Sequence, residues 1–224
     1  MRENITRSVE DYLKAVFELT RNGGRASTTD LAEILKVTPA SVTGMVQKLS
    51  ATDTPLLKYK KHQGVELTRD GEKVALETIR HHRLIEMFLY ETLGYSWDEV
   101  HEEADRLEHV ISEDFEERIA RFLGNPTHDP HGDPIPTRDL KLPSSSSIRL
   151  SELRPGDVAR VERVRDDDPE LLRHLSSLGL KPPARVQVTS YSPLDENLTL
   201  KIEGRSEPAV LGKKITSLVY TEKE

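Results

Sequence analysis

The sequence of 224 residues contains no cysteine. This absence excludes disulfide bonds, thiolate zinc sites and a cysteine nucleophile, and it fits a reducing compartment. No apolar run has the length of a membrane-spanning helix, and the first residues lack the pattern of a secretory signal peptide. We therefore expect a cytoplasmic protein with no membrane partner. Hydrophobic residues make up 35% of the chain and aromatic residues 5%, which favours one to three small domains with modest cores.

Negative charge is concentrated in the middle of the chain. The formal net charge is −7 in total, but residues 76–140 carry −10, residues 1–75 carry +2 and residues 141–224 carry +1. An acidic segment repels phosphate and attracts cations, so the middle of the chain is suited to a metal rather than to nucleic acid. The N-terminal segment is free to bind DNA.

The first 75 residues have the pattern of three helices followed by a hairpin. Apolar residues recur at helical spacing in residues 5–20. A second helix is predicted to begin after a cap at Thr28 or Thr29, and a third begins at Thr38-Pro39. Residues 58–68 predict a β-hairpin that turns at Gln63-Gly64. This order is that of a winged helix-turn-helix, although a small α+β domain without DNA-binding activity could share it.

The third helix is predicted to be the recognition helix. Val42, Met45, Val46 and Leu49 form an inward apolar face, and small or polar residues form the opposite face. Basic residues of the hairpin would contact the DNA backbone or the minor groove. Hydroxyl groups can read bases or phosphates, so the target sequence is not predicted. The predicted DNA contacts are Ser41, Thr43, Gln47, Lys48, Lys58, Lys60, Lys61 and His62.

Histidines and carboxylates share helical spacing in the middle segment, where helical patterns cover residues 69–92 and 97–123. Residues four apart lie on one face of a helix, and such clustered acids are costly unless a cation neutralises them. Imidazole and carboxylate without thiolate favour a hard divalent metal such as Mn²⁺ or Fe²⁺. The alternative is a solvated acidic helix with scattered histidines. The pattern comprises His82, Glu86, His101, Asp105, Glu108 and His109.

The remainder of the chain predicts a loop, a linker and a small β domain. Phe115, Ile119 and Phe122 could form either a dimer seam or ordinary core. Residues 124–140 are rich in Pro, Gly and Asp, and we expect His128 and His131 there to be exposed. The serine-rich end of this segment predicts a flexible linker. Short alternating runs at 158–164, 184–191, 197–204 and 215–222 predict strands of a small β-barrel, with one helix ending at Gly179.

Taken together, these segments resemble the diphtheria-toxin-repressor family of metal-dependent regulators, and in particular its manganese-sensing branch. The motifs are SVEDYLKAVFEL, PASVTGMVQKL, HHRLIEMFL, WDEVHEEADRLEHVISED and GNPTHDPHGDPIP. The resemblance implies an α+β multidomain chain. Its parts would be a winged helix-turn-helix (residues 1–75), a helical metal-binding and dimerisation domain (76–140), a linker (141–148) and an SH3-like, FeoA-like β-barrel (149–224).

The resemblance also implies two metal sites. The primary site would use Asp11, Asp105, Glu108 and His109, and the ancillary site would use His82, Glu86 and His101. The barrel would add Asp168 or Glu170 to the ancillary site. Iron-sensing members carry methionine and cysteine at the positions of Asp11 and Asp105. Two carboxylates in their place should favour Mn²⁺, with Fe²⁺ as the alternative.

The function that follows is a homodimeric repressor of metal-uptake genes, not an enzyme, which binds a double-stranded DNA operator when Mn²⁺ is bound. An iron-dependent regulator of the same family is the nearest alternative. A metal-dependent hydrolase would need a further base or nucleophile, and no motif supplies one. A constitutive DNA-binding protein with purely structural acids would bind DNA equally well in EDTA.

Overall fold

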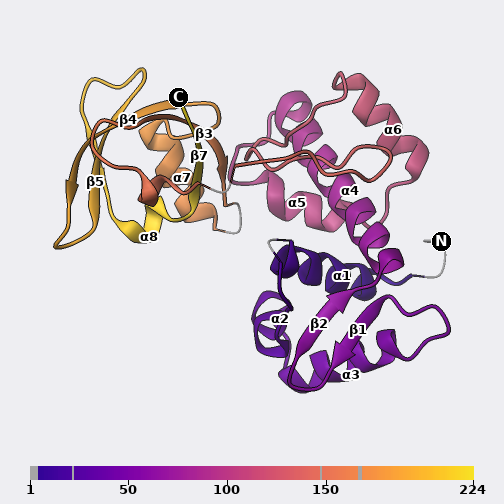
Figure 1. Cartoon of the computed structure of the whole chain (residues 1–224). Coiled ribbons are helices and arrows are strands. Elements are labelled where there is room, and N and C mark those ends of the chain that lie inside the picture. The colour runs from indigo at the N-terminus through magenta and orange to yellow at the C-terminus, as the bar shows by residue number, and fades with distance from the viewer. Residues whose placement is uncertain (1–4, 22, 147, 166–167) are drawn as a thin grey trace. The chain divides into compact units, whose positions relative to one another are not determined.

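The computed structural model describes residues 5–21, 23–146, 148–165 and 168–224 (Figure 1). The chain divides into two compact units. The first comprises residues 1–81 and 138–141, and the second comprises residues 82–137 and 142–224. No helix in the described ranges is both long enough and apolar enough to cross a membrane.

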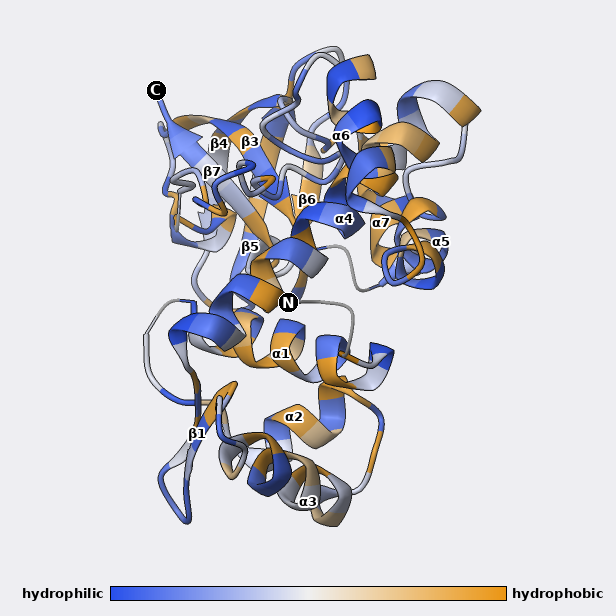
Figure 2. Cartoon of the chain, turned by 90° about the vertical axis from the view of Figure 1, so that its right-hand side faces the viewer, coloured by the Kyte–Doolittle hydropathy of each residue, from blue (hydrophilic) through white to orange (hydrophobic). Residues whose placement is uncertain are grey.

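The N-terminal unit is the expected helix-turn-helix with its hairpin. It contains α1 (Arg7–Thr20), α2 (Thr28–Ile34), α3 (Pro39–Ser50) and the beginning of α4 (Arg69–Leu93). Figure 2 shows that α1, α2 and α3 each carry hydrophobic and hydrophilic residues. Their apolar sides bury Leu13, Val16, Leu31, Val42, Val46 and Leu49.

The caps of the two short helices show how well local sequence predicts their ends. Thr38 accepts a hydrogen bond from Ser41 N and Pro39 is the first helical residue, as predicted. The predicted cap of α2 at Thr28 or Thr29 is wrong. Ser27 has the extended conformation that a cap requires, and its Oγ accepts from Asp30 N at 3.0 Å, so the helix starts directly after Ser27.

The hairpin consists of β1 (Leu57–Lys60) and β2 (Gly64–Leu67), which pair in antiparallel fashion. The turn requires a glycine at Gly64. Its φ is +92°, and a Cβ there would lie 2.7 Å from the carbonyl oxygen of Ala26. This close approach accompanies the bridge between Ala26 and Val65, so the hairpin is attached to the segment before α2.

The helices of the second unit are the rest of α4, α5 (Val100–Leu107) and α6 (Glu113–Phe122). The predicted continuous helical pattern from 97 to 123 is therefore interrupted. The interruption lies between Leu107 and Glu113. Ser112 caps the start of α6, because its Oγ accepts a hydrogen bond from Phe115 N. Ile119 is core, whereas Phe115 and Phe122 are 47% and 68% exposed, so the three apolar residues do not share one role.

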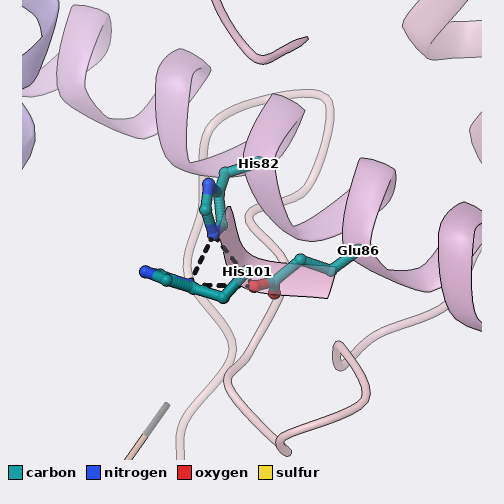
Figure 3. A group of neighbouring side chains, drawn as sticks. All are labelled: His82, Glu86 and His101. Atoms are coloured by element: carbon teal, nitrogen blue, oxygen red, sulfur yellow. Dashed lines mark hydrogen bonds and ion pairs between the residues drawn. The ribbon is translucent and has the colours of Figure 1, made fainter. Parts of the chain in front are cut away.

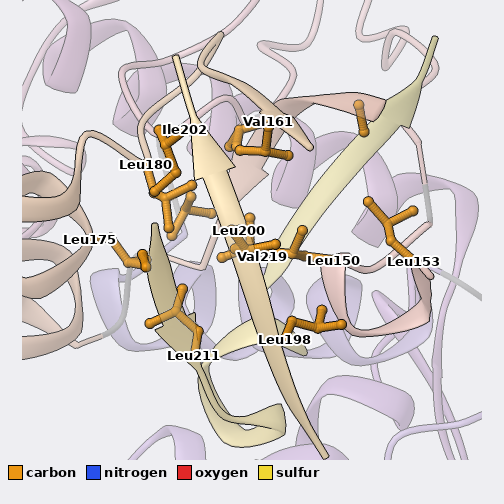
Figure 4. Close-up of a cluster of buried hydrophobic side chains, with 14 of the residues drawn as sticks. Leu150, Leu153, Val161, Leu175, Leu180, Leu198, Leu200, Ile202, Leu211 and Val219 are labelled. Carbon is orange, nitrogen blue, oxygen red and sulfur yellow. The ribbon is translucent and has the colours of Figure 1, made fainter. Parts of the chain in front are cut away.

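The C-terminal domain is a five-stranded antiparallel sheet with the strand order β6-β5-β4-β3-β7. Its strands are β3 (Val158–Val164), β4 (Arg185–Ser192), β5 (Asn197–Ile202), β6 (Ala209–Leu211) and β7 (Val219–Lys223). The 3-10 helix η2 (Leu150–Glu152) precedes β3, and α7 (Pro169–Leu178) and α8 (Lys213–Thr216) lie between strands. Figure 4 shows the aliphatic core, which includes Val161, Leu175, Leu200 and Val219.

Two predictions for this domain need correction. The strand expected at 215–222 begins only at Val219, because α8 occupies the preceding residues, and β6 was not predicted. The end of α7 at Gly179 is confirmed, with a φ of +77°.

The loop after α6 is more ordered than its composition suggests. His131 is fully buried, so the expectation that it is exposed is wrong, while His128 is half-buried. In the predicted linker, the Ser146 hydroxyl donates to the carbonyl of Thr221 at 2.8 Å, and the Ser146 N–H donates to Glu162. At Ser146 the segment is therefore bonded to the C-terminal domain and is not a free linker. Ser147 lies outside the described residues.

Candidate metal centre and DNA-binding surface

His82 of α4 is the centre of a buried polar cluster. Its Nε2 lies 3.0 Å from Glu86 Oε1 and 3.1 Å from His101 Nδ1. His101 Nδ1 in turn lies 3.1 Å from the same Glu86 oxygen (Figure 3). Glu86 follows His82 by one helical turn and His101 comes from α5. The structure thus brings together the three residues predicted for the ancillary site.

The other ring nitrogen of His82 faces a second group of carboxylates. Nδ1 lies 2.5 Å from Glu108 Oε2 and 3.3 Å from Asp105 Oδ1. Glu108 is buried, whereas the side chain of Asp105 is 47% exposed. His109 Nε2 lies 3.2 Å from Glu108 Oε1. His82 therefore belongs to two groups that could each hold a metal ion.

A third group was not found from the sequence. Glu86, Asp129 and His131 are all buried, and their ligand atoms lie within 4.8 Å of one another. Glu86 Oε2 and Asp129 Oδ2 have no hydrogen-bond partner among the described residues. His131 Nε2 lies 2.8 Å from the carbonyl oxygen of Trp97 and can only donate to it, so the neutral ring carries its lone pair on Nδ1. That nitrogen lies 3.9 Å from Glu86 Oε2.

The pKa values of two of these carboxyls are shifted in opposite directions, although burial raises both. Burial alone raises the pKa of Glu86, but the charge of His82 and hydrogen bonds from the neighbouring histidines outweigh it and hold that pKa well below its usual range. Burial raises the pKa of Asp129 well above its usual range, and the carboxylates of Glu86 and Asp133 raise it further against the effect of Arg83. A cation is the simplest partner for such a site.

The donor chemistry of the three groups is nitrogen and oxygen only. The chain has no cysteine, and Met87 packs against the apolar cluster around Leu84. Buried carboxylate oxygens without a hydrogen-bond partner and an imidazole held by a backbone carbonyl are typical of a metal site. The residues present therefore fit a hard or borderline divalent ion such as Mn²⁺ or Fe²⁺.

Three further predicted ligands belong to other parts of the chain. Asp11 is half-buried on α1 in the N-terminal unit. Asp168 caps α7, where its Oδ1 accepts from the backbone N–H groups of Glu170 and Leu171. Within the described ranges, none of the candidate metal groups includes Asp168 or Glu170. Ligation by the barrel stays a prediction.

The predicted DNA contacts are presented by α3 and the hairpin. Ser41, Gln47 and Lys48 are exposed and Thr43 is half-buried. The hydroxyl of Thr43 donates to Pro39 O at 2.9 Å, which leaves its methyl group for outside contacts. All four hairpin residues, Lys58, Lys60, Lys61 and His62, are exposed.

The cationic side chain of Arg25 lies beside the hairpin and was not predicted from the sequence. The Nε of Arg25 binds Glu66 at 2.8 Å and its Nη1 donates to Gln63 at 3.2 Å. Only the pairing of the hairpin with the preceding segment brings Arg25 there, so no local pattern could have indicated it.

A helix-turn-helix with a cationic hairpin, followed by buried histidines and carboxylates, defines a metal-dependent DNA-binding regulator. The domain matches agree. Residues 4–65 match the iron-dependent repressor N-terminal DNA-binding domain, residues 68–137 match its metal-binding and dimerisation domain, and residues 148–223 match the FeoA domain. The chain belongs to the iron-dependent repressor family, which includes the diphtheria toxin repressors. It is a metal-dependent DNA-binding repressor of that family rather than an enzyme.

Similar proteins include regulators named for different metals. The iron-dependent repressor IdeR of Mycobacterium leprae (strain TN) is 34% identical over 217 residues, which cover 88% of this chain and 93% of the relative. A manganese-dependent transcriptional repressor in complex with manganese has a TM-score of 0.87 at 34% identity, covering 96% of this chain and 100% of that one. The structure of ScaR with bound Zn²⁺ has a TM-score of 0.81 at 34% identity, covering 96% and 99%.

Proposed function

We propose that this protein is a homodimeric repressor of metal-uptake genes whose binding to a double-stranded DNA operator is activated by Mn²⁺. The observation that carries the proposal is the sulfur-free group of buried carboxylates and imidazoles around His82 and Glu86. Oxygen and nitrogen donors suit Mn²⁺ well. A relative named for manganese supports this choice, and a relative named for iron makes Fe²⁺ the alternative activator.

The ligands fall into two proposed sites. Following the resemblance, Asp11, Asp105, Glu108 and His109 would hold the primary ion. His82, Glu86 and His101 would hold the ancillary ion. Asp129 and His131 are further candidate ligands, because they form a group with Glu86 that could hold a metal ion. Asp168 or Glu170 would supply the barrel's ligand.

Asp11 would connect metal binding to DNA binding. It lies on α1 of the unit that contains α3, and the other proposed ligands lie in the second unit. Ligands from both units on one ion would fix the recognition helix relative to the dimerisation domain. A dimer binds two half-sites only when its recognition helices are correctly spaced. In the metal-free protein the competent fraction would fall, and the apparent operator affinity with it.

Exposed apolar residues support the dimer. Phe115 and Phe122 of α6 and Val110 before it are 47%, 68% and 74% exposed. Large apolar side chains so exposed on α6 and in the turn before it are typical of an interface. They lie in the stretch that matches the family's metal-binding and dimerisation domain.

Fluorescence anisotropy with labelled promoter fragments tests the proposal. Wild type, Asp11→Ala and the control Glu18→Ala would be titrated in Mn²⁺, Fe²⁺, Zn²⁺ or EDTA. Glu18 lies on the same helix, where it pairs with Arg21 at 3.1 Å. We expect tight binding only with Mn²⁺, or with Fe²⁺ as well, and a loss of at least about tenfold in Asp11→Ala, since such couplings are on the order of 1–3 kcal/mol. Equal binding in EDTA would show that metal is not the switch.

A further inference from the structure

Asp129 and His131 reach the metal centre from a loop whose turn is closed by hydrogen bonds within the loop. Within the loop, Asp129 Oδ1 accepts from the backbone N–H groups of His131 and Asp133 at 2.8 and 2.9 Å. These bonds define a tight turn but do not determine where the turn lies. Its position depends on contacts with α4 on one side and with the C-terminal domain on the other.

The α4 contact is made by Arg83. Its Nη1 donates to Pro134 O at 2.6 Å, and its Nη2 lies 3.3 Å from Asp133 Oδ1. Its Nε lies 3.5 Å from Asp129 Oδ2. Arg83 therefore holds the turn on the same helix that carries His82 and Glu86.

The C-terminal domain makes an equally close contact through β3. Val164 N donates to His131 O at 2.9 Å, and Arg163 Nη1 lies 3.4 Å from Asp133 Oδ1. Gly132 has a φ of +90°, and a Cβ there would lie 1.9 Å from the carbonyl oxygen of Glu162. The backbone of the loop thus rests directly on the strand, at a distance that only glycine permits.

Arg163 is itself held in place. It is 7% exposed, and its guanidinium lies 3.8 Å from the centroid of the Tyr220 ring on β7. A buried arginine stacked on an aromatic ring has little freedom, so it presents a fixed charge to Asp133. A lysine could not reproduce this stacked, forked geometry.

We propose that β3 of the FeoA domain is a positioning element of the metal centre, with Arg163 as its positioning residue. By fixing the turn at Gly132 and Asp133, β3 keeps Asp129 and His131 within reach of Glu86. The domain then contributes to metal binding through the loop, whether or not it also donates a ligand. This inference rests on the proposed function, because it assumes that the centre binds a divalent ion.

The protein's single tryptophan reports the position of this loop. Trp97 Nε1 donates to Pro130 O at 2.9 Å, and its ring lies 5.3 Å from that of His131. Arg163→Met and Gly132→Ala both disturb the contact with β3, one through charge and one through sterics. Arg160→Met is the matched control, since Arg160 lies on the same strand but its side chain is 52% exposed.

The experiment uses the full-length chain and compares these variants in two measurements. The first is Trp97 emission and acrylamide quenching in the apo protein, and the second is Mn²⁺ binding followed by the EPR signal of free Mn²⁺. We expect red-shifted, more quenchable emission and Mn²⁺ affinity lower by about 10–100-fold in Arg163→Met and Gly132→Ala, as for other residues that support ligands. The control should match wild type in both measurements.

The possible results separate the two proposals. Unchanged Mn²⁺ affinity in either variant, together with red-shifted and more quenchable Trp97 emission, would overturn the positioning role while leaving the metal site intact. Weaker Mn²⁺ binding with unchanged Trp97 emission would also overturn it, because the loop would not have moved. A wild type that binds no Mn²⁺ would instead refute the proposed function, and this inference with it. If Arg163→Met does not fold by circular dichroism, Gly132→Ala gives the same readouts without removing a charge.

Discussion

Replacement of Asp129 by asparagine should change the stability of the apo protein and its response to metal in opposite directions. Asparagine keeps the oxygen that accepts from His131 N and Asp133 N, so the turn is preserved. It removes a buried carboxyl whose pKa is raised well above its usual range, chiefly by burial. In the folded apo protein this carboxyl therefore holds its proton to higher pH than in the unfolded chain.

The sign of the pH dependence follows from that difference. The folded state binds the extra proton, so the stability that Asp129 contributes is fully present below the unfolded pKa of about 3.9. It is lost as the pH rises through the raised folded pKa. Asparagine does not titrate, so at neutral pH apo Asp129→Asn should be more stable than wild type, with the difference disappearing in acid. Mn²⁺ must displace the proton, so its affinity for wild type should rise with pH over the same window.

The metal response can be given a magnitude. An ion at 100 times its Kd stabilises the folded state by about 2.7 kcal/mol. If the variant binds about 100-fold more weakly, at the upper end of the range for residues around a metal, the same Mn²⁺ concentration stabilises it by only about 0.4 kcal/mol. Urea unfolding followed by Trp97 fluorescence, with Mn²⁺ or EDTA, measures both effects. The exposed Asp139→Asn is the control.

Either of two outcomes would refute this reasoning. An equal Mn²⁺-induced stabilisation in wild type and Asp129→Asn would show that the carboxylate is not a ligand. An apo variant no more stable than wild type at neutral pH would show that Asp129 is not held at a raised pKa and serves only to form the turn.

Two further predictions concern the DNA-binding unit. Replacing both Lys60 and Lys61 by alanine should make the slope of log affinity against log salt concentration shallower by about 0.9 for each lysine that contacts a phosphate. Anisotropy titrations at several salt concentrations measure this slope. An unchanged slope would show that these two lysines do not contact the DNA backbone. Gly44→Ala should stabilise the N-terminal unit by about 1 kcal/mol, because glycine is costly within a helix and the added Cβ would meet no atom of the described residues within 4 Å. Chemical denaturation followed by circular dichroism would measure this, and a loss of stability would contradict it.

Local pattern predicted those features that local interactions determine. Pro39 and Thr38 place the start of α3, and the i, i+4 rule joins His82 to Glu86. The packing of α5 against α4 then brings in His101, as two amphipathic helices with matching stripes would suggest. The break before Ser112 was missed because apolar residues on both sides of it continue the same helical spacing.

Tertiary contacts decide the rest of the candidate site. Asp129 and His131 lie in a Pro- and Gly-rich loop without periodicity, so their spacing carries no information about their neighbours. Their burial depends on Arg83, more than 40 positions earlier in the chain, and on the approach of β3 to Gly132. The alternation in residues 215–218 likewise predicted a strand, although these residues form part of α8 and the turn that follows it.

The place of His82 between its neighbours has a consequence for metal loading. A neutral imidazole has one lone pair available for coordination, and its other nitrogen carries the proton. If Nε2 binds an ion beside Glu86 and His101, Nδ1–H must donate to Glu108 or Asp105, and the reverse holds if Nδ1 binds. Occupation of one group therefore selects the tautomer that the other group meets. The two groups cannot both use this ring as a neutral ligand, so an ion bound at one group makes His82 a hydrogen-bond donor to the other group.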